Sequence, residues 1–138
     1  MELVIFTDGG SLNNPGQAAS AFVMSMDGKE IYSEGKALGI ATNNEAEYTA
    51  LINALTKVIE MKNSGTLNRL TKISCFADST LMVQQVNGLW KVKHAPIREH
   101  IFKIRNIEQE IAVPITYTYV PREQNTVADG LVKKALGR

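Results

Sequence analysis

Several features common in proteins are scarce or missing in this 138-residue sequence. It has one cysteine, Cys75, so no intramolecular disulfide can form, and a reducing, cytoplasmic compartment is expected. No segment approaches the roughly 18 consecutive apolar residues that a membrane span needs. The opening MELVIF is too short and too acidic for a signal peptide. We therefore expect no membrane association and no disulfide framework.

Strong net charge is also missing, because 15 basic residues nearly balance 14 acidic ones. The net charge of +1 gives no global field that would attract nucleic acid. The charge is nevertheless uneven: residues 91–105 hold five basic side chains against one acidic one, or +4 in fifteen residues. This basic stretch is either a solvated helix face or a surface that follows phosphates. Within it, we take Lys91 and Lys93 as candidate substrate contacts.

Hydrophobic periodicity predicts one α/β domain over residues 1–138. A hydrophobic content of 44% suits a globular chain of this length with a single core, and no repeat or linker interrupts it. The patterns favour strands at 2–8, 19–26, 30–38, 71–78 and 113–120, and helices at 43–61, 79–87, 95–111 and 125–136. Asp27-Gly28 is a hairpin signal, and residues 42–45, TNNE, have the form of a capping box. A meander followed by alternating strands and helices predicts a mixed sheet covered by helices.

Four acidic residues occur at positions where a carboxylate is unexpected. Asp8 follows the apolar run LVIF, and Asp78 ends the strand-like run KISCFAD. Ligand sites of open α/β sheets gather outside such strand ends. Glu47 lies on the apolar stripe of the first helix, so it should point inward, and Asp129 lies on the apolar side of the closing helix. Each acid alone fits a cap, a loop or a surface charge, but together they are candidates for one site.

Carboxylates that converge require a neutralising cation, because like charges at close range are unstable. The lone cysteine and two histidines offer no soft ligand cluster, so oxygen ligation by Mg²⁺ or Mn²⁺ is favoured over zinc. Two such ions about 4 Å apart are the usual arrangement for in-line hydrolysis of a phosphodiester.

The motifs TDGGSLNNPG, TNNEAEYTAL, ADS and VPREQNTVADGLVKKAL resemble, in order and spacing, those of type 1 ribonuclease H. They anchor nearly the whole chain, and their combination is highly specific. The final motif is similar to that of a shorter bacterial and archaeal branch that reads VPRExN. The resemblance implies a ribonuclease H-like fold, a five-stranded mixed sheet flanked by helices. It also implies a metal-dependent endonuclease that cleaves the RNA strand of RNA–DNA hybrids, leaving 5′-phosphate and 3′-hydroxyl ends.

The resemblance also assigns roles to individual residues. The catalytic, metal-binding acids would be Asp8, Glu47, Asp78 and Asp129, with Asp8 bridging two Mg²⁺ or Mn²⁺ ions. The residues that match hybrid-contacting positions are Asn14, Asn43 and Asn44, and Thr42 matches a residue that helps to hold a DNA phosphate. An asparagine amide both donates and accepts hydrogen bonds, as recognition of a 2′-hydroxyl requires.

The sequence departs from the longer family members in three ways. Their loop histidine is absent, and VPREQN supplies Arg122 and Glu123 as possible auxiliary residues; His94 and His100 match no catalytic position. Their basic protrusion is reduced to NGLWKVKHAP, in which Trp90 receives no role. No hybrid-binding domain precedes the catalytic one in this sequence. We therefore expect modest substrate affinity.

Two alternative functions compete with this prediction. The first is a DNA-cutting enzyme of the same fold, such as a resolvase or an integrase-like enzyme; the complete TDGGSxxNPG and TNNEAE motifs argue against it. The second is a module that binds hybrids without cutting them. Retention of four acids argues against that, because pure binding gains nothing from negative charge beside phosphates. The expected partner is an RNA–DNA hybrid, with no obligate protein partner.

Overall fold

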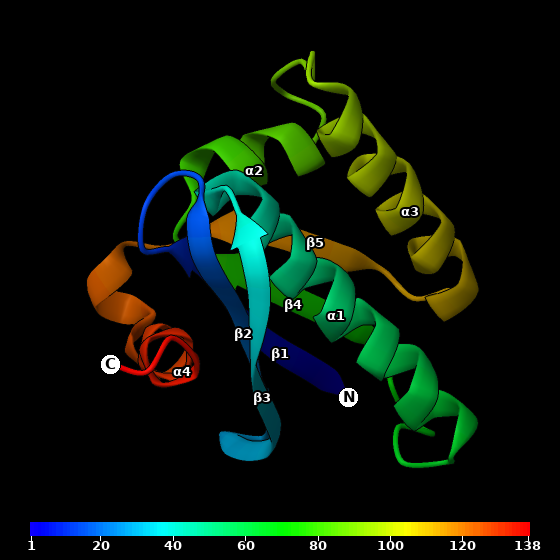
Figure 1. The fold of residues 1–138 in the computed structure, drawn as a ribbon. Helices are drawn as coiled ribbons and strands as arrows, with labels where there is room; N and C mark the ends of the chain where they lie inside the picture. Colours follow the sequence, from blue (N-terminus) through cyan, green and yellow to red (C-terminus); the bar gives the residue numbers. More distant parts are fainter.

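Five strands form one mixed sheet in the order β3-β2-β1-β4-β5 (Figure 1). The computed structural model describes residues 1–138. The strands are β1 (Glu2–Ser11), β2 (Gly16–Met26), β3 (Lys29–Ala41), β4 (Lys72–Ala77) and β5 (Ile115–Tyr119). The first three strands pair antiparallel, whereas β1, β4 and β5 pair parallel. The predicted five-stranded mixed sheet is confirmed.

Helices cover both faces of this sheet. They are α1 (Asn43–Asn63), α2 (Thr80–Val86), α3 (Ala95–Ile111) and α4 (Thr126–Ala135), with a short 3₁₀ turn, η1 (Arg122–Gln124), that the sequence did not predict. Figure 1 shows α1 lying along one face with α3 beside it, whereas α4 lies on the other face against β1, β2 and β3. None of these helices combines the length and the apolar character needed to cross a membrane.

Strand alternation decides which side chains each helix covers. On β2, Phe22 and Met24 join the main core under α1, whereas Ala19 and Ala21 pack with Val132 of α4 on the opposite face. The predicted apolar stripe of α1 is buried in the main core, and its two leucines, Leu51 and Leu55, are fully buried. The two faces therefore differ: a large apolar core on one side, and small residues that admit α4 closely on the other.

Strand β1 continues three residues further than the sequence suggested. The expected strand ended at Asp8, but Gly9, Gly10 and Ser11 go on pairing with β2. The parallel pairing with β4 does stop at Thr7. Asp8 is therefore the first residue at which β1 separates from β4, and it is fixed in a strand and not in a loop.

The predicted hairpin turn before β3 and the predicted capping box after it are both confirmed. Asp27 and Gly28 both have positive φ, 52° and 76°, as the tight hairpin turn between β2 and β3 requires. Beyond β3, the Thr42 hydroxyl accepts a hydrogen bond from the Glu45 backbone N–H at 3.1 Å, and the Glu45 carboxylate accepts one from the Thr42 N–H at 3.2 Å. This capping box fixes where α1 begins, and hence where its first turn points.

Gly9 of β1 has no side chain, and this allows α1 to lie directly on the strand. A Cβ at Gly9 would lie 2.5 Å from the Glu47 backbone nitrogen and closer still to the Ala46 carbonyl group. The contact involves backbone atoms on both sides, so no side-chain rotation would relieve it. At Gly10, one residue further along the same strand, the nearest atoms are 3.9 Å and 4.0 Å away, which is ordinary van der Waals contact.

We expect Gly9→Ala to lower the free energy of unfolding by roughly 1–3 kcal/mol, because α1 must move away from β1. Gly10→Ala is the matched control and should be neutral to within about 1 kcal/mol. Urea denaturation of both variants measures the difference. Equal destabilisation by the two substitutions would show that the close approach of α1 is not what requires glycine.

Candidate active site

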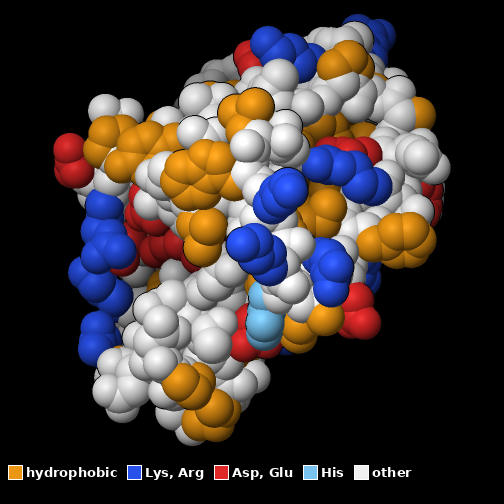
Figure 2. Space-filling view, turned by 90° about the horizontal axis from the view of Figure 1, so that it is seen from above, with side chains coloured by type: hydrophobic (Ala, Val, Ile, Leu, Met, Phe, Trp, Pro, Cys, Tyr) orange, Lys and Arg blue, Asp and Glu red, His pale blue; other side chains and the backbone are white.

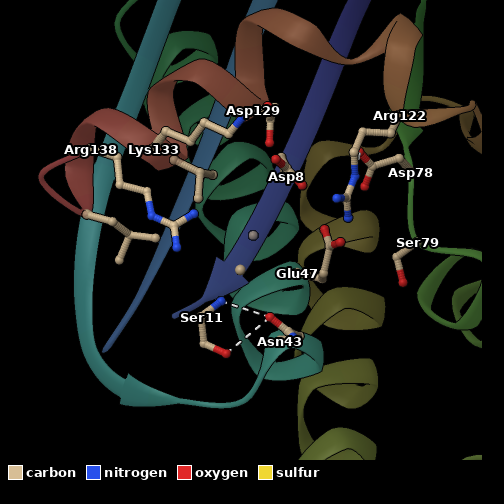
Figure 3. Close-up of a pocket in the computed structure, with 14 residues that line it drawn as sticks. Asp8, Ser11, Asn43, Glu47, Asp78, Ser79, Arg122, Asp129, Lys133 and Arg138 are labelled. Atoms are coloured by element: carbon tan, nitrogen blue, oxygen red, sulfur yellow. Dashed lines mark hydrogen bonds and ion pairs between the residues drawn. The ribbon is translucent and has the colours of Figure 1, made fainter. Parts of the chain in front are cut away.

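Three acidic side chains converge beside the ends of β1 and β4. Asp8, Glu47 and Asp78 each offer one carboxylate oxygen, and these atoms all lie within 4.8 Å of one another. Asp129 lines the same pocket but is not part of that group of three (Figure 3). The structure thus brings the four predicted acids to one place, three of them closely and Asp129 at the side of the cluster.

Each acid is positioned by a different element. Asp8 lies within β1 and Asp78 follows β4, and parallel neighbours bring their carboxyl ends to the same edge of the sheet. Glu47 lies at the start of the second turn of α1, which crosses Gly9. On β1, Asp8 pairs with Ala21, whose side chain faces α4, so Asp8 and Asp129 approach each other on that face.

Asn125 connects α4 to β1, and the sequence analysis missed it. Its amide Nδ2 donates a hydrogen bond to the Thr7 carbonyl oxygen at 2.8 Å, and only 1% of the residue is exposed. The bond joins the N-cap of α4 to the residue before Asp8, and so determines where Asp129 lies. Asparagine before a helix predicts a cap, but nothing in the sequence indicates a partner 118 positions away.

The crowded acids strongly perturb each other's protonation. Burial, followed by the nearby carboxylates of Asp78 and Asp129, raises the pKa of Asp8 to about 7. Burial, followed by Asp8 and Asp78, also raises the pKa of Glu47 well above its ordinary range. The Gly9 N–H and the Arg122 guanidinium offset part of both shifts. Such repulsion favours either protonation or a bound cation.

The donor set fits a hard divalent cation. The Glu47 Oε1 and Asp78 Oδ2 atoms are buried without a hydrogen-bond partner, which is costly for a carboxylate oxygen. The three grouped ligand atoms are all carboxylate oxygens, no His or Cys lines the pocket, and Cys75 is buried in the core. Oxygen-only donors suit Mg²⁺ or Mn²⁺ and disfavour zinc. The residues present therefore fit divalent metal binding.

Three basic residues line the pocket, and two of them, Arg122 and Lys133, approach the acids from opposite sides (Figure 3). Arg122 Nε lies 4.0 Å from Asp78 Oδ2, as its predicted auxiliary role would require, whereas Glu123 is exposed and does not line the pocket. Lys133 Nζ lies 3.0 Å from Asp129 Oδ2. The sequence analysis missed Lys133, although its spacing of four residues from Asp129 on a helix was a usable signal.

The asparagines near the cluster are held by a local network. The Asn43 Oδ1 accepts hydrogen bonds from the backbone N–H of Ser11 at 2.8 Å and from its hydroxyl at 3.1 Å. The Asn14 Oδ1 accepts one from the Asn43 N–H at 2.9 Å. Because both lone pairs of the Asn43 oxygen are occupied, its amide can only donate to a ligand. In this arrangement Asn43 offers its N–H groups to a ligand, and its contact with a hybrid stays a prediction.

The remaining predicted contacts lie at different places around the pocket. The Thr42 hydroxyl, besides capping α1, donates to the Glu45 carboxylate at 3.0 Å. The side-chain oxygen of Asn44 is buried without a partner. Lys91 and Lys93 are exposed in the segment between α2 and α3, where Figure 2 shows Lys and Arg side chains grouped around a histidine.

Not all of the basic stretch is free for a ligand. Arg105 forms an ion pair with Glu108 at 3.0 Å and donates to the Val86 carbonyl oxygen, so it serves the packing of α3. His100 stacks on the ring of Tyr48, with centroids 5.9 Å apart. Neither His100 nor His94 lines the acidic pocket.

An acidic site at the carboxyl ends of β1 and β4, in a sheet ordered β3-β2-β1-β4-β5, defines the ribonuclease H-like class of α/β proteins. A family model described as reverse transcriptase-like matches residues 6–135. The bifunctional protein Rv2228c of Mycobacterium tuberculosis is 37% identical over 138 residues, which are 99% of this chain and 36% of that protein. The chain thus spans about a third of the length of this relative.

Solved structures agree over the whole length of the chain. RNase H1 of the archaeon Halobacterium salinarum is 33% identical with a TM-score of 0.88, covering 99% of this chain and 98% of that one. LC11-RNase H1, solved in complex with an RNA/DNA hybrid, is 34% identical with a TM-score of 0.90, covering 98% and 96%. The chain belongs to the type 1 ribonuclease H family.

The raised pKa of Asp8 predicts how the stability of the metal-free protein depends on pH. Asp8 binds its proton more tightly when folded, with a pKa of about 7 against 3.8 for the ordinary group. Its contribution to stability is therefore complete below about pH 3.8 and is lost as the pH rises through about 7. In EDTA, the free energy of unfolding of Asp8→Asn should therefore increase relative to that of wild type as the pH rises between these values.

Urea denaturation of wild type and Asp8→Asn from pH 4 to pH 8 measures this difference. Taking the difference between the two proteins removes the contribution of titrating groups far from Asp8 and leaves that of Asp8 together with Glu47, whose pKa depends on the Asp8 charge. A difference that does not change with pH would mean that Asp8 titrates normally in the folded protein.

Proposed function

We propose that this chain is a metal-dependent endonuclease that hydrolyses the RNA strand of RNA–DNA hybrids. The observation that carries the proposal is the convergence of Asp8, Glu47 and Asp78 within 4.8 Å, with two buried oxygens lacking partners. Membership of the type 1 ribonuclease H family and the hybrid complex of LC11-RNase H1 support the substrate. The products would carry 5′-phosphate and 3′-hydroxyl ends.

The metal would be held by the four acids. Asp8, Glu47 and Asp78 provide the inner group of oxygens, and Asp129 provides a further carboxylate at its side. When bound, a pair of Mg²⁺ or Mn²⁺ ions supplies an activated water and stabilises the leaving oxygen. Asp8, which lies between the other acids in Figure 3, is suited to bridge two ions. The rigid strand around Asp8 keeps this position constant.

Substrate recognition is assigned to residues on both sides of the acids. Asn43 presents an amide donor to the hybrid, held in one orientation by Ser11. A donor can bind the oxygen of a 2′-hydroxyl or an acceptor in the minor groove. We assign further hybrid contacts to Asn14 and Asn44. Thr42 would help to hold a DNA phosphate by turning its hydroxyl from the Glu45 carboxylate to donate to a phosphate oxygen.

Two residues replace the loop histidine of longer members. Arg122, whose Nε lies 4.0 Å from Asp78, would place a positive charge beside the phosphate that is cleaved. Glu123 is exposed and outside the pocket, so its auxiliary role would depend on movement when substrate binds. Of the two, Arg122 is the stronger assignment because it already reaches the acids.

Residues 1–138 would form one catalytic domain that acts in the cytoplasm without an obligate protein partner. A DNA-cutting enzyme and a module that binds without cutting remain the competing functions. The ordered network around Asn43 favours RNA recognition over the first, and the two buried carboxylate oxygens without a hydrogen-bond partner favour metal-dependent catalysis over the second.

Cleavage assays distinguish the three functions. Labelled RNA–DNA hybrid, double-stranded RNA and double-stranded DNA are each incubated with Mg²⁺, Mn²⁺ or EDTA. We expect cleavage of the RNA strand of the hybrid alone, and only with a divalent metal. Cleavage of double-stranded DNA, or hybrid binding without cleavage in either metal, would overturn the proposal.

Asp8→Asn and Asp78→Asn should reduce cleavage at least 100-fold while leaving hybrid binding intact. Each substitution keeps the shape of the side chain but removes the charge that holds the metal, and a bound metal accounts for several kcal/mol of the lowered barrier, or about 100-fold or more. Single-turnover rates and filter binding in Ca²⁺ measure the two effects separately. A rate within tenfold of wild type for either variant would contradict the metal assignment.

The lysines between α2 and α3 should contribute to hybrid affinity and not to chemistry. Lys91→Ala combined with Lys93→Ala should raise KM several-fold with little change in kcat, because each phosphate contact adds roughly one unit to the log–log salt slope. Steady-state kinetics at several salt concentrations measure this slope. Arg105→Ala is a control, since Arg105 is engaged within the fold. A salt slope unchanged by the double substitution would make this surface a solvated face.

A further inference from the structure

Asp129 differs from the other acids because a lysine is bound to it. Lys133 Nζ lies 3.0 Å from Asp129 Oδ2, one helical turn along α4. The lysine side chain is 55% exposed and the aspartate side chain 25%, so the pair lies at the mouth of the pocket and not in its interior. Figure 3 shows the Lys133 side chain extending from α4 towards Asp129, on the side of the cluster away from Arg122.

Asp129 is nevertheless close enough to act on the metal-binding acids. It lines the pocket that holds them, and its charge contributes to the raised pKa of Asp8. A divalent cation among those acids would therefore attract Asp129 as well. One oxygen of Asp129 is occupied by the lysine, and the positive charge of Lys133 would repel the cation. Both effects weaken the interaction between Asp129 and a metal.

We propose that Lys133 competes with the divalent cation for Asp129, so that Lys133 limits how tightly the pocket binds metal. This inference rests on the proposed metal site and extends it to a residue outside the four acids. Lys133 is here a positioning residue: with metal bound it releases Asp129, and without metal it neutralises that carboxylate. Arg122 takes the corresponding place beside Asp78, but at 4.0 Å it holds its partner less closely.

The geometry of the Lys133–Asp129 pair gives the direction and the size of the expected change in metal affinity. Removing the lysine charge frees the Asp129 oxygen and removes a repulsive charge, so metal affinity should increase. The pair is partly exposed, and pairs of this kind contribute little, which sets the expected change at about two- to fivefold. Lys134 provides a matched control, because it is the next residue of the same helix and exposed, yet it lies outside the acidic pocket.

The experiment measures metal binding directly, in the full chain and without nucleic acid. Lys133→Gln and Lys134→Gln each remove one charge while keeping a long polar side chain. Isothermal titration with Mn²⁺ and with Mg²⁺ gives the dissociation constants, and the metal-induced rise in Tm gives an independent readout. We expect the dissociation constant to fall about two- to fivefold for Lys133→Gln and to stay at the wild-type value for Lys134→Gln.

A double-mutant cycle tests the dependence on Asp129. In the background of Asp129→Asn, Lys133→Gln should keep only the smaller gain that comes from removing its repulsive charge, because no carboxylate remains to compete for. Unchanged or weaker metal binding in Lys133→Gln would overturn the inference, as would equal shifts in the two lysine variants. So would an increase in KM for the hybrid with metal affinity unchanged, which would make Lys133 a substrate contact. If wild type binds neither metal, the proposed function fails as well.

Discussion

Repulsion among buried carboxylates is the constraint on which the rest of this structure depends. Three acids lie within 4.8 Å of one another at the sheet edge, and burial together with their mutual charge raises the pKa values of Asp8 and Glu47. No flexible segment would hold such groups together, because they would move apart into water. The surrounding elements must therefore be rigid. The neighbouring basic side chains must lie where they reduce the repulsion without filling the site.

Backbone contacts supply that rigidity. Gly9 lets α1 lie directly on β1, which brings Glu47 over the strand that carries Asp8. The capping box fixes the first turn of α1, and the hydrogen bond from Asn125 to Thr7 ties α4 to the same strand. Asp8, Glu47 and Asp129 thus lie on packed elements, and Asp78 directly follows one. Arg122 and Lys133 then approach from the two open sides with exposed side chains that can move when a metal or a phosphate arrives.

Much of the fold could be predicted from local patterns, since periodicity, caps and turns depend on neighbouring residues. The helix at 95–111 was expected with the bounds that it has, and the others differ by two residues or fewer. Strand ends were less predictable: β1 runs on to Ser11, because pairing with β2 and not local composition decides where it stops. The η1 turn was missed for a similar reason, as its three residues have no periodicity to recognise.

The sequence by itself determined the fold class, the four candidate acids and the oxygen-only character of the site, because these depend on residue types and their spacing along the chain. Only the tertiary structure decided that Asp8, Glu47 and Asp78 form the close group, with Asp129 at its side. It also decided that the Asn43 oxygen is occupied by Ser11, which leaves only a donor for a ligand. The reason is physical: protonation, ion pairing and hydrogen-bond saturation depend on distances between atoms from distant segments, and spacing along the chain does not specify those distances.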